Sequence, residues 1–264
     1  MKANKRKICL FVALTAMILL ILCEIFSISE LFGIDGDSHL GISLKMILTR
    51  FFGGAAFLAM LINLEYRVLN PIKRPFWRSV LISLPALLIA VNNFPFFAVI
   101  MGKARVIEGA PMLLLLFLEC MTVGFFEEIA FRGVVFLGIL KKAPEDKLRA
   151  FVSIALSSVI FGLVHLVNLI ESAPGAVFLQ IGYSTLIGAM CAVVLLKTAN
   201  IWLCVVIHGL YNFAGAVIPR MGEGVIWDSF TVILTAFVSL AVAVYMTVLF
   251  LKGKTRVTGE IYRN

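Results

Sequence analysis

Residues 111–140 read PMLLLLFLECMTVGFFEEIAFRGVVFLGIL, an apolar run of 30 residues with four charged side chains near its middle. As an α-helix this run would be about 45 Å long, because each residue adds about 1.5 Å. The hydrocarbon core of a bilayer is only about 30 Å thick. We therefore predict a membrane helix that tilts, protrudes or bends, and Gly124 is the expected point of bending.

Further apolar runs lie on both sides of this one. Hydrophobic residues make up 61% of the chain and charged residues 14%, whereas soluble domains have about 45–50% and about 25%. This composition predicts an all-α, polytopic membrane protein whose functional site lies inside the helix bundle. The eight predicted spans are 8–31, 43–63, 79–101, 111–140, 150–170, 175–196, 201–218 and 226–251.

The eight prolines agree with these limits. Proline breaks a helix interior but suits its first turn. Six prolines lie in predicted loops or at span ends: Pro71, Pro75, Pro111, Pro144, Pro174 and Pro219. Pro85 and Pro95 lie within the third span, which we expect them to kink.

The loops differ in their content of basic residues. With the N-terminus inside, the inner segments hold 17 Lys and Arg residues, and the outer loops hold Lys103, Arg105 and Arg220. Cytoplasmic loops of membrane proteins are enriched in such residues. We predict a multi-pass protein of the cell membrane with both termini in the cytoplasm. It forms one integral membrane domain, 1–264, with a motif-bearing core at 111–218, and its basic N-terminus leads into a retained first span rather than a cleaved signal peptide.

The net charge and the cysteines exclude two other classes of function. The formal charge of +8 comes from short clusters between apolar runs, so we read it as a topology signal and expect no nucleic acid partner. The five cysteines are scattered within apolar segments and form no C-x-x-C pair. They predict neither a disulfide framework nor a thiolate metal site.

Polar residues inside the predicted spans are the candidates for function. A charge at the centre of a membrane helix costs about 2.5–3.5 kcal/mol, so it is usually kept for a reason. The candidates are Glu24, Glu119, Glu127, Glu128, Arg132, His165, Asn168, His208 and Asn212. Glu24 lies near the outer end of its span and is expected to reach solvent, and the role of Glu119 stays open between a cavity-lining group and a member of an ion pair.

Glu127 and Glu128 are expected to have different roles. Glu128 and Arg132 are four residues apart on one helical face, in the order that favours an ion pair, and so form a supporting pair. Glu127 has Phe131 four residues on and therefore no partner on its own helix. An unpaired carboxylate in a membrane span is a candidate general base and needs a partner from another helix.

Two other spans offer imidazole groups. His165 is followed by Asn168 on nearly the same face, and His208 is followed one turn later by Asn212. A carboxylate and an imidazole can activate a water molecule, and a His/Asn pair can stabilise an oxyanion, so these residues suit amide hydrolysis. They equally suit a catalytic zinc ion with Glu127, His165 and His208 as ligands. His39 lies in a polar outer loop and is expected to be solvated, with a weak surface metal site as the alternative.

The motifs Glu127-Glu128-x-x-x-Arg132, Phe161-x-x-x-His165 and His208-x-x-x-Asn212, with Gly133 after the arginine, occur in this order on successive apolar segments. They resemble the CPBP (Abi) family of CAAX prenyl proteases and bacteriocin-processing enzymes. The resemblance implies a membrane fold of eight helices and an intramembrane endopeptidase. It assigns Glu127 and His165 to water activation, His208 and Asn212 to the oxyanion, and Glu128 with Arg132 to positioning.

The resemblance leaves the cofactor and the substrate open. A metal-free mechanism is favoured because His208 and Asn212 suit a donor pair better than a pair of ligands, and zinc is the alternative. The substrate is a peptide or protein of the CAAX type, or a small bacteriocin-related peptide, with or without a lipid. The short basic loops resemble those of a bacterial member.

Two further functions remain as alternatives. Glu119, Glu127 and the histidines also suit a proton or cation path through a transporter, although no inverted repeat is present. A non-catalytic immunity or scaffold protein would keep the fold, tolerate loss of Glu127 and depend on the Glu128–Arg132 pair.

Overall fold

The computed structural model describes residues 2–26, 28–69, 75–141, 147–225, 229–252 and 261–262, and these are almost entirely helical. The α-helices are α1 (Lys2–Ile25), α2 (His39–Leu64), α3 (Phe76–Asn92), α4 (Phe96–Ile100), α5 (Ala110–Glu128), α6 (Leu137–Leu140), α7 (Lys147–Leu163), α8 (Pro174–Thr198), α9 (Ile201–Met221) and α10 (Ser229–Lys252). Two 3₁₀ segments, η1 (Ile28–Phe32) and η3 (Val164–Ile170), and a π-helix, η2 (Ile129–Phe136), complete the helical elements. The strands β1 (Ala104–Val106) and β2 (Gly222–Gly224) pair antiparallel, with Ala104 opposite Gly224.

The all-α, multi-pass architecture is confirmed, but the predicted total of eight spans is not. Six helical segments within the described ranges are long and apolar enough to cross a bilayer: Asn4–Ile25, His39–Leu64, Ala150–Ile170, Pro174–Thr198, Ile201–Met221 and Ser229–Lys252. The third predicted span contains α3, which is apolar but only 17 residues long. The fourth is divided among α5, η2 and α6 and carries the charged groups of the candidate site.

Proline interrupts the third predicted span rather than kinking it at both positions. Pro85 lies inside α3, whereas α3 ends at Asn92 and Pro95 immediately precedes α4. Proline lacks a backbone N–H and its ring collides with the preceding turn, so a helix is broken there. Pro111 and Pro174 lie in the first turns of α5 and α8 as predicted. Pro219 lies in the last turn of α9, Pro75 precedes α3, and Pro71 and Pro144 lie outside the described residues.

The α-helix is not interrupted at Gly124, the expected point of bending. The α-helical pattern continues through Gly124 and changes to a π-helix only at Ile129, directly after the glutamate pair. Gly124 instead allows α5 to approach α9, because a Cβ there would lie 2.8 Å from the Val205 carbonyl oxygen and 2.9 Å from the Gly209 nitrogen. π-helical turns occur frequently at functional sites.

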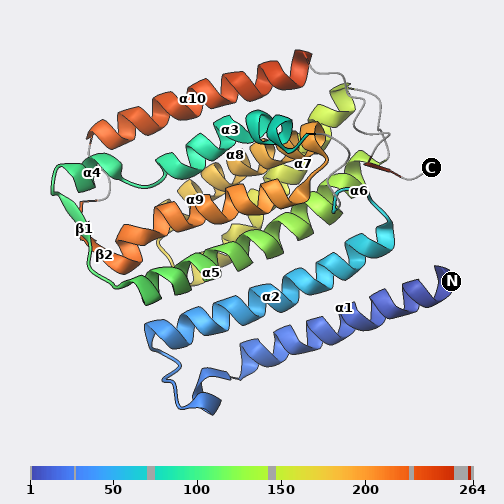
Figure 1. Cartoon of the computed structure of the whole chain (residues 1–264), viewed down its shortest axis with the longest axis horizontal. Coiled ribbons are helices and arrows are strands. Elements are labelled where there is room, and N and C mark those ends of the chain that lie inside the picture. The colour runs from blue at the N-terminus through green and yellow to red at the C-terminus, as the bar shows by residue number, and fades with distance from the viewer. Residues whose placement is uncertain are drawn as a thin grey trace.

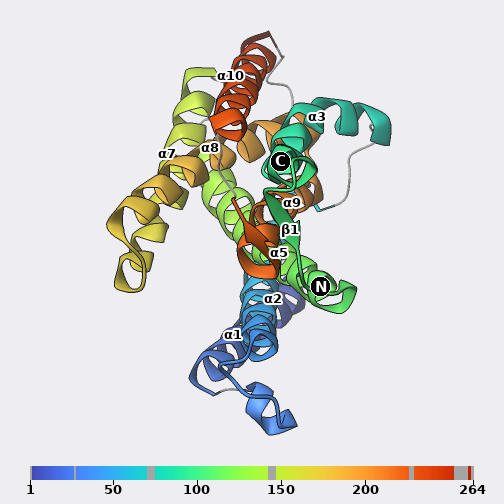
Figure 2. The same cartoon turned by 90° about the vertical axis from the view of Figure 1, so that its left-hand side faces the viewer.

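The helices form a bundle with α5 and α9 at its centre. Helix α1 packs on α2, α2 on α5, and α5 on α9, while α7 and α8 pack together on another side (Figures 1 and 2). Helix α1 begins and α10 ends at the same end of the bundle, opposite the β1–β2 hairpin (Figure 1). The largest buried apolar cluster includes much of α8 and the first half of α9, so these two helices form a rigid support for the residues at the centre.

Candidate functional site

Helices α5 and α9 bring both glutamates of the sequence motif to one histidine. Glu127 and Glu128 are the last two residues of α5, and His208 lies in the middle of α9. The His208 Nδ1 atom is 2.7 Å from Glu128 Oε1, and its Nε2 atom is 3.4 Å from Glu127 Oε2. The side chains of Glu128, His208 and Glu127 are 0%, 6% and 18% exposed. Glu127 is therefore the member of this group that is most open to a reactant.

Glu128 is also paired with Arg132, as the sequence predicted. The Arg132 Nε atom lies 3.1 Å from Glu128 Oε2, and both side chains are almost completely buried. The guanidinium carbon lies 4.3 Å from the centre of the Phe161 ring, a distance at which a cation is attracted to the ring face. Glu128 is thus held between a cation and an imidazole, which fixes the position of His208.

His165 reaches the same cluster through Phe161. The Phe161 ring makes edge contacts with the imidazoles of His165 and His208, at centroid distances of 5.3 and 5.7 Å. The His165 Nδ1 atom lies 3.0 Å from the Phe161 carbonyl oxygen. A carbonyl oxygen only accepts hydrogen bonds, so Nδ1 carries the proton and Nε2 of a neutral His165 keeps its lone pair.

The two candidate asparagines differ in their surroundings. Asn212 lies on α9 one turn after His208 and is half-buried, and its carboxamide has no hydrogen-bond partner within the described ranges. Asn168 shares a face with His165, because residues three apart align in the 3₁₀ segment η3. Its amide donates to Gln180 Oε1 over 2.8 Å. Asn212 is therefore available to a reactant, whereas Asn168 joins η3 to α8.

Glu119 pairs with Arg220, a residue predicted to lie in an outer loop. Helix α9 continues to Met221, so Arg220 lies in its last turn and makes a two-pronged contact with Glu119, with Nη1–Oε1 2.5 Å and Nη2–Oε2 2.9 Å. Arg220 Nη2 also donates to Ser43 of α2 over 3.3 Å. The assignment of Arg220 to a loop is thus corrected. The sequence feature that could have predicted this pair is Glu119 in an apolar span, because a buried carboxylate requires a cation.

The Glu119–Arg220 pair has an exposed counterpart that makes a matched comparison. We expect Arg220→Ala to lower the free energy of unfolding by about 2–3 kcal/mol, because it leaves a buried carboxylate without its cation. Arg105 pairs with Glu223 at the same end of the bundle, but these side chains are 76% and 54% exposed. Arg105→Ala should cost less than about 1 kcal/mol. Denaturant titration in detergent micelles measures both values, and equal losses would contradict a stabilising role for the buried pair.

Two other candidate residues lie away from the glutamate–histidine cluster. Glu24 forms an exposed ion pair with Lys45, with the charged atoms 3.6 Å apart, in agreement with the expected contact with solvent. His39 is the first residue of α2 and is exposed. Within the described ranges it belongs to no group of three metal-ligating side chains.

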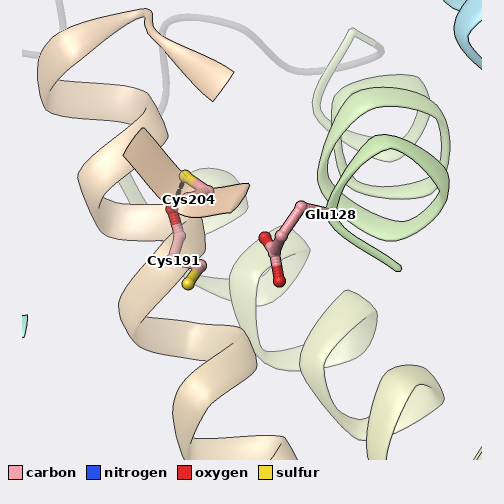
Figure 3. A group of neighbouring side chains, drawn as sticks. All are labelled: Glu128, Cys191 and Cys204. Atoms are coloured by element: carbon pink, nitrogen blue, oxygen red, sulfur yellow. Dashed lines mark hydrogen bonds between the residues drawn. The ribbon is translucent and has the colours of Figure 1, made fainter. Parts of the chain in front are cut away.

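One cluster of possible metal ligands lies beside Glu128. Glu128, Cys191 and Cys204 have ligand atoms within 4.8 Å of one another, and all three residues are buried (Figure 3). The Cys204 thiol donates to the Cys191 carbonyl oxygen over 3.2 Å, so it carries a proton, whereas a metal ligand is a thiolate. Both Glu128 oxygens already face His208 and Arg132. This cluster therefore fits the packing of α8 on α9 better than the binding of a metal ion.

The predicted zinc ligands meet only in part. A tetrahedral zinc ion holds nitrogen and oxygen ligands roughly 3.4 Å apart, which equals the separation of His208 Nε2 and Glu127 Oε2. Among the residues described, His165 does not join these two in a group of three ligand atoms within 4.8 Å. The pair thus has the spacing of two zinc ligands without the third.

Residues 109–214 match the family model described as type II CAAX prenyl endopeptidase Rce1-like. This range contains the glutamate pair, Arg132, both membrane histidines and Asn212. No curated protein and no solved structure matches the chain. The order of the three motifs and the family match agree: residues 109–214 are similar to the Rce1-like type II CAAX prenyl endopeptidases, which are membrane proteases, and this supports assignment of the chain to the CPBP family.

Proposed function

We propose that this protein is an intramembrane endopeptidase that hydrolyses a peptide bond with a water molecule activated by Glu127 and His165. The observation that carries the proposal is the contact of His208 with Glu127 on one side and Glu128 on the other. A carboxylate next to an imidazole that is itself held by a buried ion pair is the arrangement that general acid–base catalysis requires.

The positions of the protons follow from the contacts of His208. Glu128 is ionised beside Arg132 and therefore only accepts, so Nδ1 of His208 carries a proton. His208 Nε2 lies 3.4 Å from Glu127 Oε2, and in the proposed reaction this pair starts with the proton on Nε2 and with Glu127 as the carboxylate. Such a pair can both remove a proton from water and stabilise a negative charge.

The proposed reaction moves one proton through Glu127. Glu127 takes a proton from water while the His165 Nε2 lone pair orients that water, and the hydroxide forms a bond to the scissile carbonyl carbon. Once Glu127 is neutral, the Nε2–H of His208 and the Asn212 amide donate to the oxyanion. Glu127 then gives its proton to the leaving nitrogen and the C–N bond breaks, which yields a carboxylic acid and an amine; a proton passes from the acid to the amine, and the final products are a carboxylate and an ammonium group.

We further propose that the substrate is a membrane-bound peptide or protein, either of the CAAX type with a lipid on its cysteine or a small bacteriocin-related peptide. Such substrates suit a site that is enclosed by apolar helices. In this proposal the protein lies in the cell membrane with both termini in the cytoplasm. The distribution of basic residues agrees with this orientation, and so does the position of the start of α1 and the end of α10 at the same end of the bundle.

Cleavage of defined peptides by the purified protein tests this proposal. Vesicles that contain the protein are incubated with one peptide ending in a CAAX sequence with a farnesylated cysteine, and with the same peptide without the lipid. Mass spectrometry is expected to show loss of the last three residues from the farnesylated peptide. Cleavage of a bacteriocin-like precursor alone would support the second substrate class, and cleavage of no peptide by a folded protein would contradict the proposal.

Removal of metal ions distinguishes the two mechanisms. The proposed reaction uses only side chains, so dialysis against EDTA and 1,10-phenanthroline should leave kcat within about twofold of the untreated value. The measurement is peptide cleavage before and after dialysis, together with the zinc content of the protein. If activity were lost with the chelators and restored by zinc alone, Glu127 and His208 would act as ligands instead.

A further inference from the structure

The guanidinium group of Arg132 is buried yet has few polar partners. The side chain is 2% exposed, and apart from the ion pair at Nε, neither Nη1 nor Nη2 has a hydrogen-bond partner within the described ranges. A buried cation of this kind is costly unless its surroundings hold it in place. Its position is therefore determined by close packing and by the Phe161 ring, 4.3 Å from the guanidinium carbon.

Helix α8 leaves space for this guanidinium at Gly188. A Cβ atom on Gly188 would lie 3.0 Å from Arg132 Nη2 and 3.3 Å from both Phe161 Cδ1 and Ser158 Cα. Glycine lowers the stability of a helix interior, so a glycine in the buried part of α8 has a packing reason. Arg132 and Phe161 occupy the space into which a side chain at position 188 would project.

We propose that Gly188 is a positioning residue for the hydrolysis assigned above: with Phe161 it forms a seat that fixes Arg132, and through Arg132 it aligns Glu128 and His208. Gly188 in α8 lies against Arg132 of the π-helix. Arg132 Nε is 3.1 Å from Glu128 Oε2 at the end of α5, and Glu128 Oε1 is 2.7 Å from His208 Nδ1 in α9. None of the three sequence motifs includes Gly188. The inference rests on the proposed function because its effect is read in the catalytic rate.

The same helix supplies a matched control. Gly182 lies six residues earlier in α8, and a Cβ there would meet no atom of the described residues within 4 Å. Gly188→Ala should lower kcat about tenfold and leave KM nearly unchanged, because it shifts Arg132 and the groups behind it without touching the substrate. Gly182→Ala should cleave the farnesylated peptide at the wild-type rate. A normal kcat in Gly188→Ala, or an equal loss in both variants, would overturn the proposal.

A second pair of variants separates an effect through Arg132 from a general packing defect. Lysine has no Nη2 atom, so Gly188→Ala should change kcat less than twofold when it is introduced into Arg132→Lys. An undiminished effect in that background would mean that the methyl group acts through Phe161 or Ser158, which contradicts a seat for the guanidinium.

The melting temperature in detergent gives a reading that does not depend on activity. Gly188→Ala is expected to lower it in the wild-type background by several degrees more than in Arg132→Lys. If the wild type cleaved no peptide, the proposed function would fail, and this difference in melting temperature would still decide whether Gly188 seats Arg132. Equal shifts in both backgrounds would overturn the seat even if the enzyme were active.

Discussion

Replacing Glu127 with glutamine should abolish peptide cleavage, with kcat lowered about 10²–10⁴-fold, while the protein still inserts into the membrane at normal abundance. The amide has the shape of the carboxylate but cannot take a proton from water, and general base catalysis contributes a factor of this size. Glu127 is partly exposed, and among the described residues its one ion pair is with His208 at 3.4 Å. Its loss should therefore affect chemistry far more than folding.

Glu24→Gln serves as the control for this experiment. Glu24 is also a membrane-helix glutamate in an ion pair, but its partner is Lys45 and both side chains are more than 40% exposed. The rate of peptide cleavage in vesicles should equal the wild-type rate in Glu24→Gln. Full activity in Glu127→Gln would remove Glu127 from the mechanism. Loss of ion flux together with normal cleavage in Glu127→Gln would instead favour a transporter.

Replacing Arg132 with alanine should give the largest loss of stability, about 3–5 kcal/mol in the free energy of unfolding. The substitution leaves Glu128 fully buried without its cation and opens a void beside Phe161. We expect low abundance in membranes and a melting temperature in detergent well below that of the wild type.

A compensating variant shows whether the charge causes this loss. If Arg132→Ala acts by stranding the Glu128 carboxylate, then Arg132→Ala with Glu128→Gln should melt at a higher temperature than Arg132→Ala alone. Both variants are expected to be inactive because His208 loses its support. A double variant that melts below the single one would indicate that packing, and not the unpaired charge, determines the stability.

Much of the helical framework could be predicted from the sequence, because apolar length and proline placement both determine where a membrane helix begins and ends. The π-helix at Ile129–Phe136 could not be predicted. It begins beside no proline, and the nearest earlier glycine, Gly124, is used for contact with α9. A change from one backbone hydrogen-bond pattern to another depends on the packing of neighbouring helices, which a single sequence does not state.

In the candidate site, a contact between residues close in sequence was predictable, whereas a contact between two distant helices was not. The Glu128–Arg132 pair was predictable because residues four apart share a helical face. The contact between Glu128 and His208 joins residues 80 positions apart, and helical periodicity indicates which face a residue lies on but not which helix it meets. Counting along the predicted spans places Glu127 about 20 Å and His208 about 12 Å from the predicted cytoplasmic ends of their helices.

The most direct test of the central claim compares the peptide termini in membranes of cells that express the wild type with those of cells that express Glu127→Gln at equal abundance. The proposed mechanism predicts new C-termini that occur only with the wild type and that identify the substrate and the scissile bond. The same termini at the same levels with both proteins would contradict an endopeptidase that depends on Glu127.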